Sequence, residues 1–226
     1  ACLAGFTFAQ DAPLWMRHSV ISPDGTTIAF TYKGDIYTVP VAGGRAMQIT
    51  TNPAYDTAPV WSPDSKRIAF ASDRMGSLDV YIVAKDGGEP RRLTTHSGSE
   101  TPLAFTDAGH VLFSAGIMPS AEAVVFPSNG QFNQVYRVSV EGGRPTMISS
   151  MPMECISINK EGAMLYQDKK GYEDYWRKHH VSPIARDIWM YTPGKEPQYR
   201  QLTTFGGEDR EPVWAPDGKT FYYLSE

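Results

Sequence analysis

The sequence has little cysteine, no long apolar run and no excess of basic residues. Its two cysteines, Cys2 and Cys155, cannot form the disulfide framework of a small secreted domain. No run approaches the ~18 apolar residues that a membrane-spanning helix needs. Lysine and arginine number 21 against 25 acidic residues, and they form no basic block. We therefore expect no membrane span and no nucleic acid partner bound through its phosphates.

The short motifs of common catalytic and metal sites are also missing. There is no Gly-x-Ser-x-Gly elbow and no His-x-His or His-Glu-x-x-His spacing. His179 and His180 are adjacent, so on an extended loop their rings point apart and do not share a metal ion. The serines of the Ser-Pro-Asp segments serve turn geometry. We expect no catalytic residue, metal or cofactor in this chain, although sequence alone leaves open a Ser-His-Asp triad assembled from distant residues.

Turn-forming residues are abundant. Twenty glycines and 17 prolines divide the 226 residues into short segments rich in Tyr, Phe, Ile and Val. Turn residues between β-branched and aromatic runs favour an all-β fold. The length is sufficient for a full hydrophobic core in one or two domains.

Both ends of the sequence indicate how the chain relates to its parent protein. Residues 1–10, ACLAGFTFAQ, are apolar and rich in small residues, and a polar pair, Gln10-Asp11, follows the run. This composition is typical of the remnant of a secretory signal peptide, with a buried first strand as the alternative. Residues 221–226 stop inside a strand-like run. We therefore expect a fragment of a longer exported protein, periplasmic or extracellular.

A repeat organises the chain between these ends. Val-Trp-Ser-Pro-Asp at 60–64, followed by Ile-Ala-Phe at 68–70, recurs near residues 20 and 213, with weaker copies near 103 and 156. The equivalent turn positions are 25, 65, 109, 162 and 218, which are 40 to 56 residues apart. Ser-Pro-Asp-Gly suits a type I turn, so each copy predicts a hairpin.

Two further strands complete each repeat. A run such as Asp-Val-Tyr-Ile-Val at 79–83 precedes a Gly-Gly turn, and a fourth run ends in threonine or serine. Four strands per repeat without helical periodicity predict the blades of a β-propeller. The predicted blades cover about 14–58, 59–101, 102–154 and 155–211, with the start of a fifth at 212–226. The fold class is therefore all-β, a propeller of four-stranded antiparallel blades in an incomplete ring.

These residues resemble a known family. Trp-Ser-Pro-Asp, Ile-Ala-Phe, Ser72-Asp73-Arg74 and Gly-Gly-Glu-Pro-Arg-Arg-Leu-Thr at 87–94 resemble the TolB-like, PD40-type propeller repeat. Phe105-Thr106-Asp107, the long insert before 134–138, and Lys170-Gly171-Tyr172 leading into 186–189 resemble the first propeller of tricorn-type serine peptidases. The resemblance covers roughly 14–226. It implies a non-catalytic propeller whose peptidase core, with the nucleophile, lies beyond residue 226.

Strand order predicts which rim of the propeller contacts a peptide or partner. In an up-and-down blade, the second-to-third loops and the blade connections share one rim. Two long insertions, at about 115–133 and 168–186, fall on that rim, and long loops in a compact domain are usually functional. The expected contact residues for a peptide or partner are three acids on the connections and a basic, aromatic loop: Asp56, Glu100, Asp209, Tyr172, Trp176, Arg177, His179 and His180. The structural alternatives are that the acids cap backbone amides and that the long loops only pack against neighbouring blades.

Three functions remain open at this point. The first is the propeller of an exported tricorn-like serine peptidase, which guides or gates peptides and scaffolds assembly, with peptides, downstream peptidase domains or a homo-oligomer as partners. The second is a TolB-like protein-binding propeller that belongs to no enzyme. The third is the lid propeller of a prolyl-oligopeptidase-type hydrolase. Whether the parent chain is an enzyme depends on sequence beyond residue 226.

Overall fold

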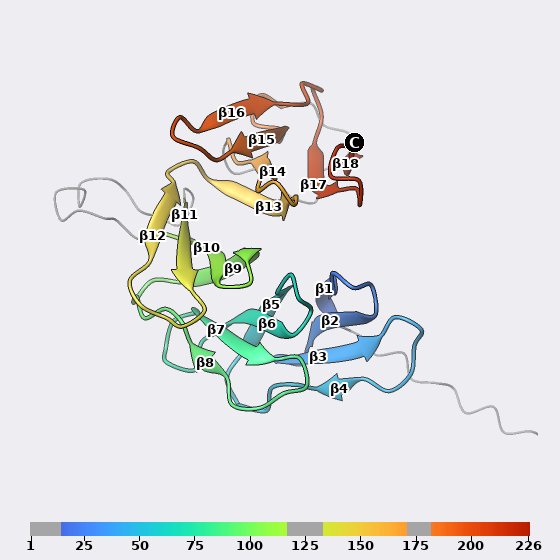
Figure 1. Cartoon of the computed structure of the whole chain (residues 1–226), viewed down its shortest axis with the longest axis vertical. Coiled ribbons are helices and arrows are strands. Elements are labelled where there is room, and N and C mark those ends of the chain that lie inside the picture. Colours follow the sequence, from blue (N-terminus) through green and yellow to red (C-terminus); the bar gives the residue numbers. More distant parts are fainter. Residues whose placement is uncertain (1–14, 117–132, 171–181) are drawn as a thin grey trace, which may run out of the picture.

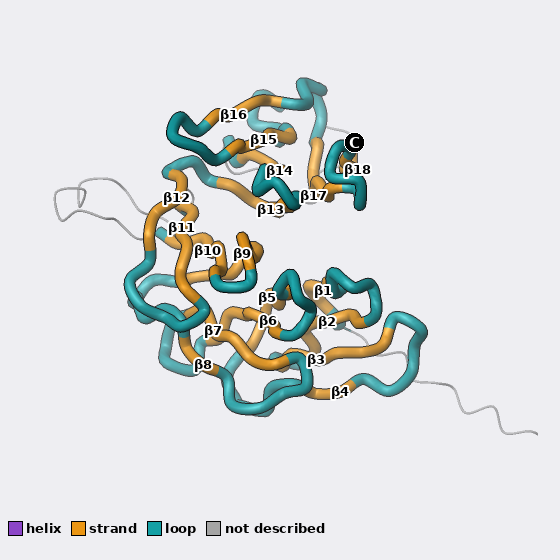
Figure 2. Tube along the Cα trace, viewed as in Figure 1, coloured by secondary structure: helices purple, strands orange, loops and turns teal. Residues whose placement is uncertain are grey.

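The computed structural model describes residues 15–116, 133–170 and 182–226 as an all-β protein. Its strands form four four-stranded antiparallel sheets and one two-stranded hairpin, and Figures 1 and 2 show no helix in these ranges. Each sheet follows chain order, so consecutive strands are neighbours. The sheets are arranged radially as propeller blades, which confirms the fold predicted from the repeat.

The first two blades lie side by side at the bottom of Figure 1. Blade 1 consists of β1 (Arg17–Ile21), β2 (Thr27–Tyr32), β3 (Asp35–Pro40) and β4 (Met47–Gln48). Blade 2 consists of β5 (Asp56–Trp61), β6 (Arg67–Ser72), β7 (Asp79–Ala84) and β8 (Arg91–Arg92).

The remaining strands continue the arc upward in the same view. Blade 3 consists of β9 (Glu100–Asp107), β10 (His110–Ala115), β11 (Gln134–Ser139) and β12 (Thr146–Ser149). Blade 4 consists of β13 (Met153–Ile158), β14 (Met164–Asp168), β15 (Ile188–Thr192) and β16 (Gln198–Gln201). The hairpin consists of β17 (Asp209–Trp214) and β18 (Phe221–Ser225). The arc is open between this hairpin and blade 1 (Figure 1).

The hydrophobic core lies between blades. Side chains alternate along a strand, so the two faces of each sheet pack against different neighbours. On β6, Ile68 and Phe70 face blade 1, whereas Ala69 packs in the cluster shared with blade 3. A third cluster joins blades 3 and 4. Both faces of an inner blade are therefore buried, which explains why its strands read as nearly continuous apolar runs.

The innermost strands share an irregularity that sequence reasoning missed. β1, β5, β13 and β17 each contain a bulge, and the residue there has a positive φ of 50° to 56°: His18, Ala58, Cys155 and Glu211. A bulge admits a proline inside a strand, and Pro59 and Pro212 follow two of these residues. The inner strands β5, β9, β13 and β17 begin at residues 56, 100, 153 and 209.

Tryptophan links neighbouring blades through the inner strands. The indole N–H of Trp61 on β5 donates to the carbonyl of Val20 on β1 at 3.2 Å. The indole of Trp214 on β17 donates in the same way to Ala163, before β14, also at 3.2 Å. Each indole thus combines interblade packing with one interblade hydrogen bond.

We predict that Trp61→Phe lowers the free energy of unfolding by roughly 1 to 2 kcal/mol, because it removes one hydrogen bond and part of a buried ring. Urea unfolding followed by circular dichroism measures the change. Tyr222→Phe is the matched control, since Tyr222 is 70% exposed and its exchange should leave the midpoint in place. Equal midpoints for Trp61→Phe and the unaltered protein would contradict this role of the indole.

Candidate functional site

The two rims of the arc differ in their loops. We call the rim formed by the β2–β3-type loops and the blade connections the connection rim; it includes 33–34, 49–55, 73–78, 93–99, 150–152 and 202–208. The other, the tight-turn rim, carries the hairpin turns between first and second and between third and fourth strands. The gap between β10 and β11 spans 116–133, and the gap between β14 and β15 spans 169–187. Both insertions therefore belong to the connection rim, as strand counting predicted.

Exposed apolar side chains gather on the loops of the connection rim. They are Tyr55 and Met151 on blade connections, Phe205 on the connection to the hairpin, and Met75 on the β6–β7 loop, each more than 40% exposed. The loops of the tight-turn rim expose only Val41 among the large apolar residues of the described ranges. The connection rim is thus the rim whose loops show the side chains typical of a contact surface.

Three of the four blade joints on the connection rim repeat one hydrogen-bond pattern, namely those between blades 1 and 2, between blades 2 and 3, and between blade 4 and the hairpin. The hydroxyl oxygen of Thr50 accepts the main-chain N–H of Ile36 on β3. In the same way, Thr94 accepts from Val80 on β7 and Thr203 from Ile188 on β15, and all three distances are 2.9 to 3.0 Å. An aspartate precedes that residue each time: Asp35, Asp79 and Asp187. The repeated Asp-Ile-Tyr, Asp-Val-Tyr and Asp-Ile-Trp triplets were the sequence signal for these acids.

The three acids predicted from sequence begin inner strands at the same joints. Asp56, Glu100 and Asp209 are the first residues of β5, β9 and β17 and are at most 1% exposed. Their main-chain N–H groups donate to the carbonyls of residues 34, 78 and 186 of the preceding blade at 2.7 to 3.0 Å. Each therefore lies close to the aspartate that begins the third strand of that blade. Contact of these carboxylates with a peptide stays a prediction.

Joint 1, between blades 1 and 2, contains a guanidinium. One nitrogen of Arg74, Nη2, reaches both oxygens of Asp56 at 2.9 and 3.0 Å, and the Arg74 Nε donates to Ser72 at 2.8 Å. The guanidinium also lies over the Tyr81 ring, 4.5 Å from its centroid. Asp35 is half-buried beside this pair, and burial followed by the Asp56 charge raises the pKa of Asp35. Arg74 therefore offsets buried negative charge.

Joint 2, between blades 2 and 3, has two buried carboxyl groups and a different cation. Asp79 and Glu100 are both 0% exposed. Arg92 pairs with Asp79 at 2.8 Å, and neither oxygen of Glu100 has a well-aligned hydrogen-bond partner among the described residues. Burial, with the Asp79 charge adding to it, raises the pKa of Glu100 from 4.5 to about 7, although the Thr94 hydroxyl opposes the shift. Joint 2 thus has one cation, which pairs with Asp79, beside two buried carboxyl groups.

Joint 4, between blade 4 and the hairpin, uses lysine. The ammonium group of Lys170 contacts Asp187 and lies 3.7 Å from Asp168. Arg186 reaches Glu208 at 3.4 Å, next to the buried Asp209. Burial raises the pKa of Asp168, and Lys170 opposes the rise. The other predicted contact residues, on the loop after Lys170, lie outside the described residues: Tyr172, Trp176, Arg177, His179 and His180.

The bulged inner strands bring polar side chains of adjacent blades together. His18 and Thr57 join through Nδ1 and Oγ1 at 3.1 Å, and burial lowers the pKa of His18, which favours a neutral imidazole. Cys155 is a free thiol that is half-buried beside Glu211. Burial, with the Glu211 charge, raises the pKa of this thiol to about 12, so it has little thiolate character.

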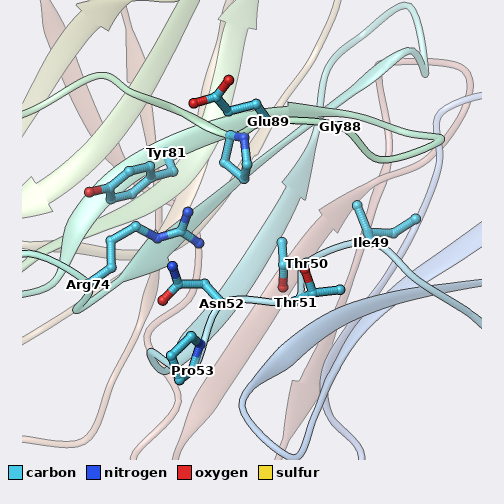
Figure 3. Close-up of a pocket in the computed structure, with 10 residues that line it drawn as sticks. Ile49, Thr50, Thr51, Asn52, Pro53, Arg74, Tyr81, Gly88 and Glu89 are labelled. Atoms are coloured by element: carbon cyan, nitrogen blue, oxygen red, sulfur yellow. The ribbon is translucent and has the colours of Figure 1, made fainter.

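A groove of about 540 Å³ lies between blades 1 and 2. One wall is the segment 49–53, which leads out of blade 1, and the other is made by Arg74, Tyr81 and the turn 88–90 of blade 2 (Figure 3). At one end the carbonyl of Ile49 approaches Gly87, where an added methyl group would come within 3.6 Å of it. We call this site the interblade groove. Sequence reasoning did not find it, because its walls come from different repeats.

The described ranges offer neither a metal cluster nor a membrane-spanning helix. No group of three or more His, Cys, Asp or Glu side chains in 15–116, 133–170 and 182–226 is arranged to hold a metal ion. Within the same ranges no helix has the length and apolar character needed to cross a bilayer. The candidate site therefore consists of the connection rim with its blade joints and the interblade groove.

Comparison with known proteins gives consistent matches. The family model described as the tricorn protease N-terminal beta propeller domain matches residues 13–226. The chain is 24% identical over 211 residues to Tricorn protease homolog 1 of Streptomyces coelicolor, which covers 93% of this chain and 19% of that protein. It is 32% identical over 210 residues to the uncharacterized peptidase YuxL of Bacillus subtilis, covering 88% of this chain and 27% of that protein.

A solved structure shows the same fold. The putative TolB from Agrobacterium tumefaciens superposes with a TM-score of 0.72 at 17% identity, covering 95% of this chain and 71% of that one. The chain spans only 19% of the length of Tricorn protease homolog 1 and 27% of the length of YuxL.

Joint 2 generates a prediction about pH. Because the pKa of Glu100 is raised from 4.5 to about 7, the folded protein binds more protons than the unfolded chain between these values. The stability contributed by protonated Glu100 is therefore full below pH 4.5 and is lost as the pH rises toward 7, by up to about 3 kcal/mol. Urea unfolding at pH 4.5 to 8 measures the loss.

Glu100→Gln should remove that part of the pH dependence, because an amide does not ionise. Glu141→Gln is the matched control, since the Glu141 side chain is 73% exposed and its exchange should leave the loss in place. Parallel curves for Glu100→Gln and the unaltered protein would contradict a raised pKa at Glu100.

Proposed function

Because the chain belongs to the family of tricorn protease N-terminal β-propeller domains, we propose that it is the non-catalytic propeller of an exported tricorn-like serine peptidase. In this role it guides or gates peptide substrates and products and scaffolds assembly, and its connection rim meets a peptide or a peptidase domain. The observation that carries the proposal is the asymmetry of the rims. The strands that flank the two long insertions end at the connection rim, and its described loops expose Tyr55, Met75, Met151 and Phe205.

Physical chemistry favours a contact surface at this rim. Exposed methionine and aromatic side chains lose water on contact and adapt to a partner's shape, so they are enriched where proteins meet. Two of them, Tyr55 and Phe205, lie on connections that a threonine-to-backbone hydrogen bond anchors to the blades. Such anchoring lowers the entropy lost on binding.

A TolB-like binding propeller that is part of no enzyme is the second candidate. The observation that favours it is the fold match to a putative TolB, of which this chain covers 71%. The two candidates share the connection rim as a contact surface and differ in the partner. A peptidase core encoded in the same polypeptide supports the first candidate, and its absence supports the second.

We predict that exchange of the rim methionines, Met75→Ser with Met151→Ser, lowers kcat/KM of the complete peptidase for peptides about tenfold, since each removes apolar contact area. The matched control is Met47→Ser with Met147→Ser. These two methionines are 55% and 42% exposed, against 65% and 45% for Met75 and Met151, but they lie on the outer strands β4 and β12. Steady-state peptide hydrolysis measures the effect. Equal losses in both double variants, or none in the rim variant, would argue against the connection rim as the contact surface.

We also predict that residues 1–226 alone do not hydrolyse peptides, because the proposal assigns them no nucleophile. Incubation of the purified chain with a peptide library, followed by mass spectrometry, provides the measurement. Cleavage that is abolished by exchange of one serine of this chain would overturn the non-catalytic assignment.

A further inference from the structure

The interblade groove contains two hydrogen-bond donors without an acceptor. Arg74 Nε and Nη2 are occupied by Ser72 and Asp56, whereas Nη1 donates to no residue of the described ranges. The Asn52 carbonyl oxygen Oδ1 accepts the main-chain N–H of Ala54 at 3.0 Å. That bond determines the orientation of the amide, so its NH2 group points toward the guanidinium, as Figure 3 shows.

The guanidinium is held rigidly. Its bidentate contact with Asp56, its bond to Ser72 and its stacking on Tyr81 leave it few alternative positions. The Arg74 side chain is only 13% exposed, so bulk water has restricted access to it. A preorganised donor of this kind loses little entropy when an acceptor arrives.

Nearby charges select an uncharged acceptor. Asp56 already neutralises Arg74, Asp35 lies close to both of them, and Glu89 adds a third carboxyl group on the same wall of the groove as Arg74. A ligand carboxylate would meet this excess of negative charge. A carbonyl oxygen accepts from both donors without that repulsion.

One wall of the interblade groove, 49–53, is backbone that belongs to no strand. Thr51, in the middle of this wall, is exposed and makes no hydrogen bond with any described residue. Main-chain groups of a bound peptide would therefore find free main-chain groups beside them.

We propose that the interblade groove binds a short extended peptide, with a main-chain carbonyl of the peptide accepting hydrogen bonds from Arg74 Nη1 and Asn52 Nδ2. This inference deepens the proposed function, because it locates one peptide-binding site of the propeller. It adds a class of ligand, an uncharged peptide backbone, and it assigns Arg74 a binding role beyond its contact with Asp56.

The deciding variant is Asn52→Asp. Aspartate keeps the acceptor for the Ala54 N–H, but it replaces the NH2 donor with an oxygen that occupies Arg74 Nη1 itself. We expect the protein to keep its fold and to bind an N-acetylated, C-amidated alanine–serine pentapeptide at least tenfold more weakly. Titration followed by NMR, with the side-chain signals of Arg74 and Asn52 as reporters, measures the affinity in the complete protein.

Asn159→Asp is the matched control. Asn159 also accepts a main-chain N–H, from Ala163 at 2.8 Å, and it lies on the tight-turn rim away from the groove. We expect its affinity for the pentapeptide to be unchanged. The same pentapeptide with a free carboxylate tests the charge argument, and it should bind no more tightly than the amide.

Undiminished binding by Asn52→Asp would overturn the proposal, and so would tenfold tighter binding of the carboxylate form. The failure would be distinguishable from failure of the proposed function. The role of the connection rim is judged by kcat/KM of the Met75 and Met151 variants, which leave the groove unaltered.

Discussion

Packing of each blade against its two neighbours is the constraint on which the rest of this structure depends. No sheet buries its own apolar face; Ile68 and Phe70 are covered by blade 1, and Ala69 lies in the cluster shared with blade 3. Stability of such an array is a sum over neighbouring interfaces. The faces at the ends of the arc, such as that of Tyr222 and Leu224 on β18, are accordingly exposed.

The blade joints solve a second problem, which is how to bury polar groups between sheets. Main-chain groups are satisfied in the same way at joints 1, 2 and 4, through a threonine hydroxyl and an inner-strand N–H. Charge is balanced differently: by Arg74 at joint 1, by Arg92 at joint 2 and by Lys170 at joint 4. Removal of one partner of such a buried pair is expensive. The repeat thus tolerates variation in the cation while it keeps the acids.

Joint 1 connects the structural and the binding roles. Arg74 stabilises the acids between blades 1 and 2, and the same contacts hold its remaining edge toward the interblade groove. The groove exists because the chain must leave the outer strand of one blade and cross to the inner strand of the next. A repeated connection therefore becomes a site where its loop residue, Asn52, meets a fixed guanidinium.

The sequence by itself determined the blades. Turn residues recurring every 40 to 56 positions and four apolar runs per repeat were sufficient, because these signals are local. They also identified the family and the rim that carries the insertions. The acids Asp56, Glu100 and Asp209 were predicted on blade connections near the central channel, but sequence could not decide whether they face the solvent or the neighbouring blade.

Only the tertiary structure decided which groups meet across a joint. Asp35 with Asp56, Asp79 with Glu100, and Asn52 with Arg74 are each contributed by different repeats or different loops, so their proximity has no local signature. Their environment depends on how adjacent blades twist against each other. Burial and the nearest charge then set the pKa of Glu100. Contacts at the joint likewise determine which edge of the Arg74 guanidinium stays free, so both properties depend on how two blades pack.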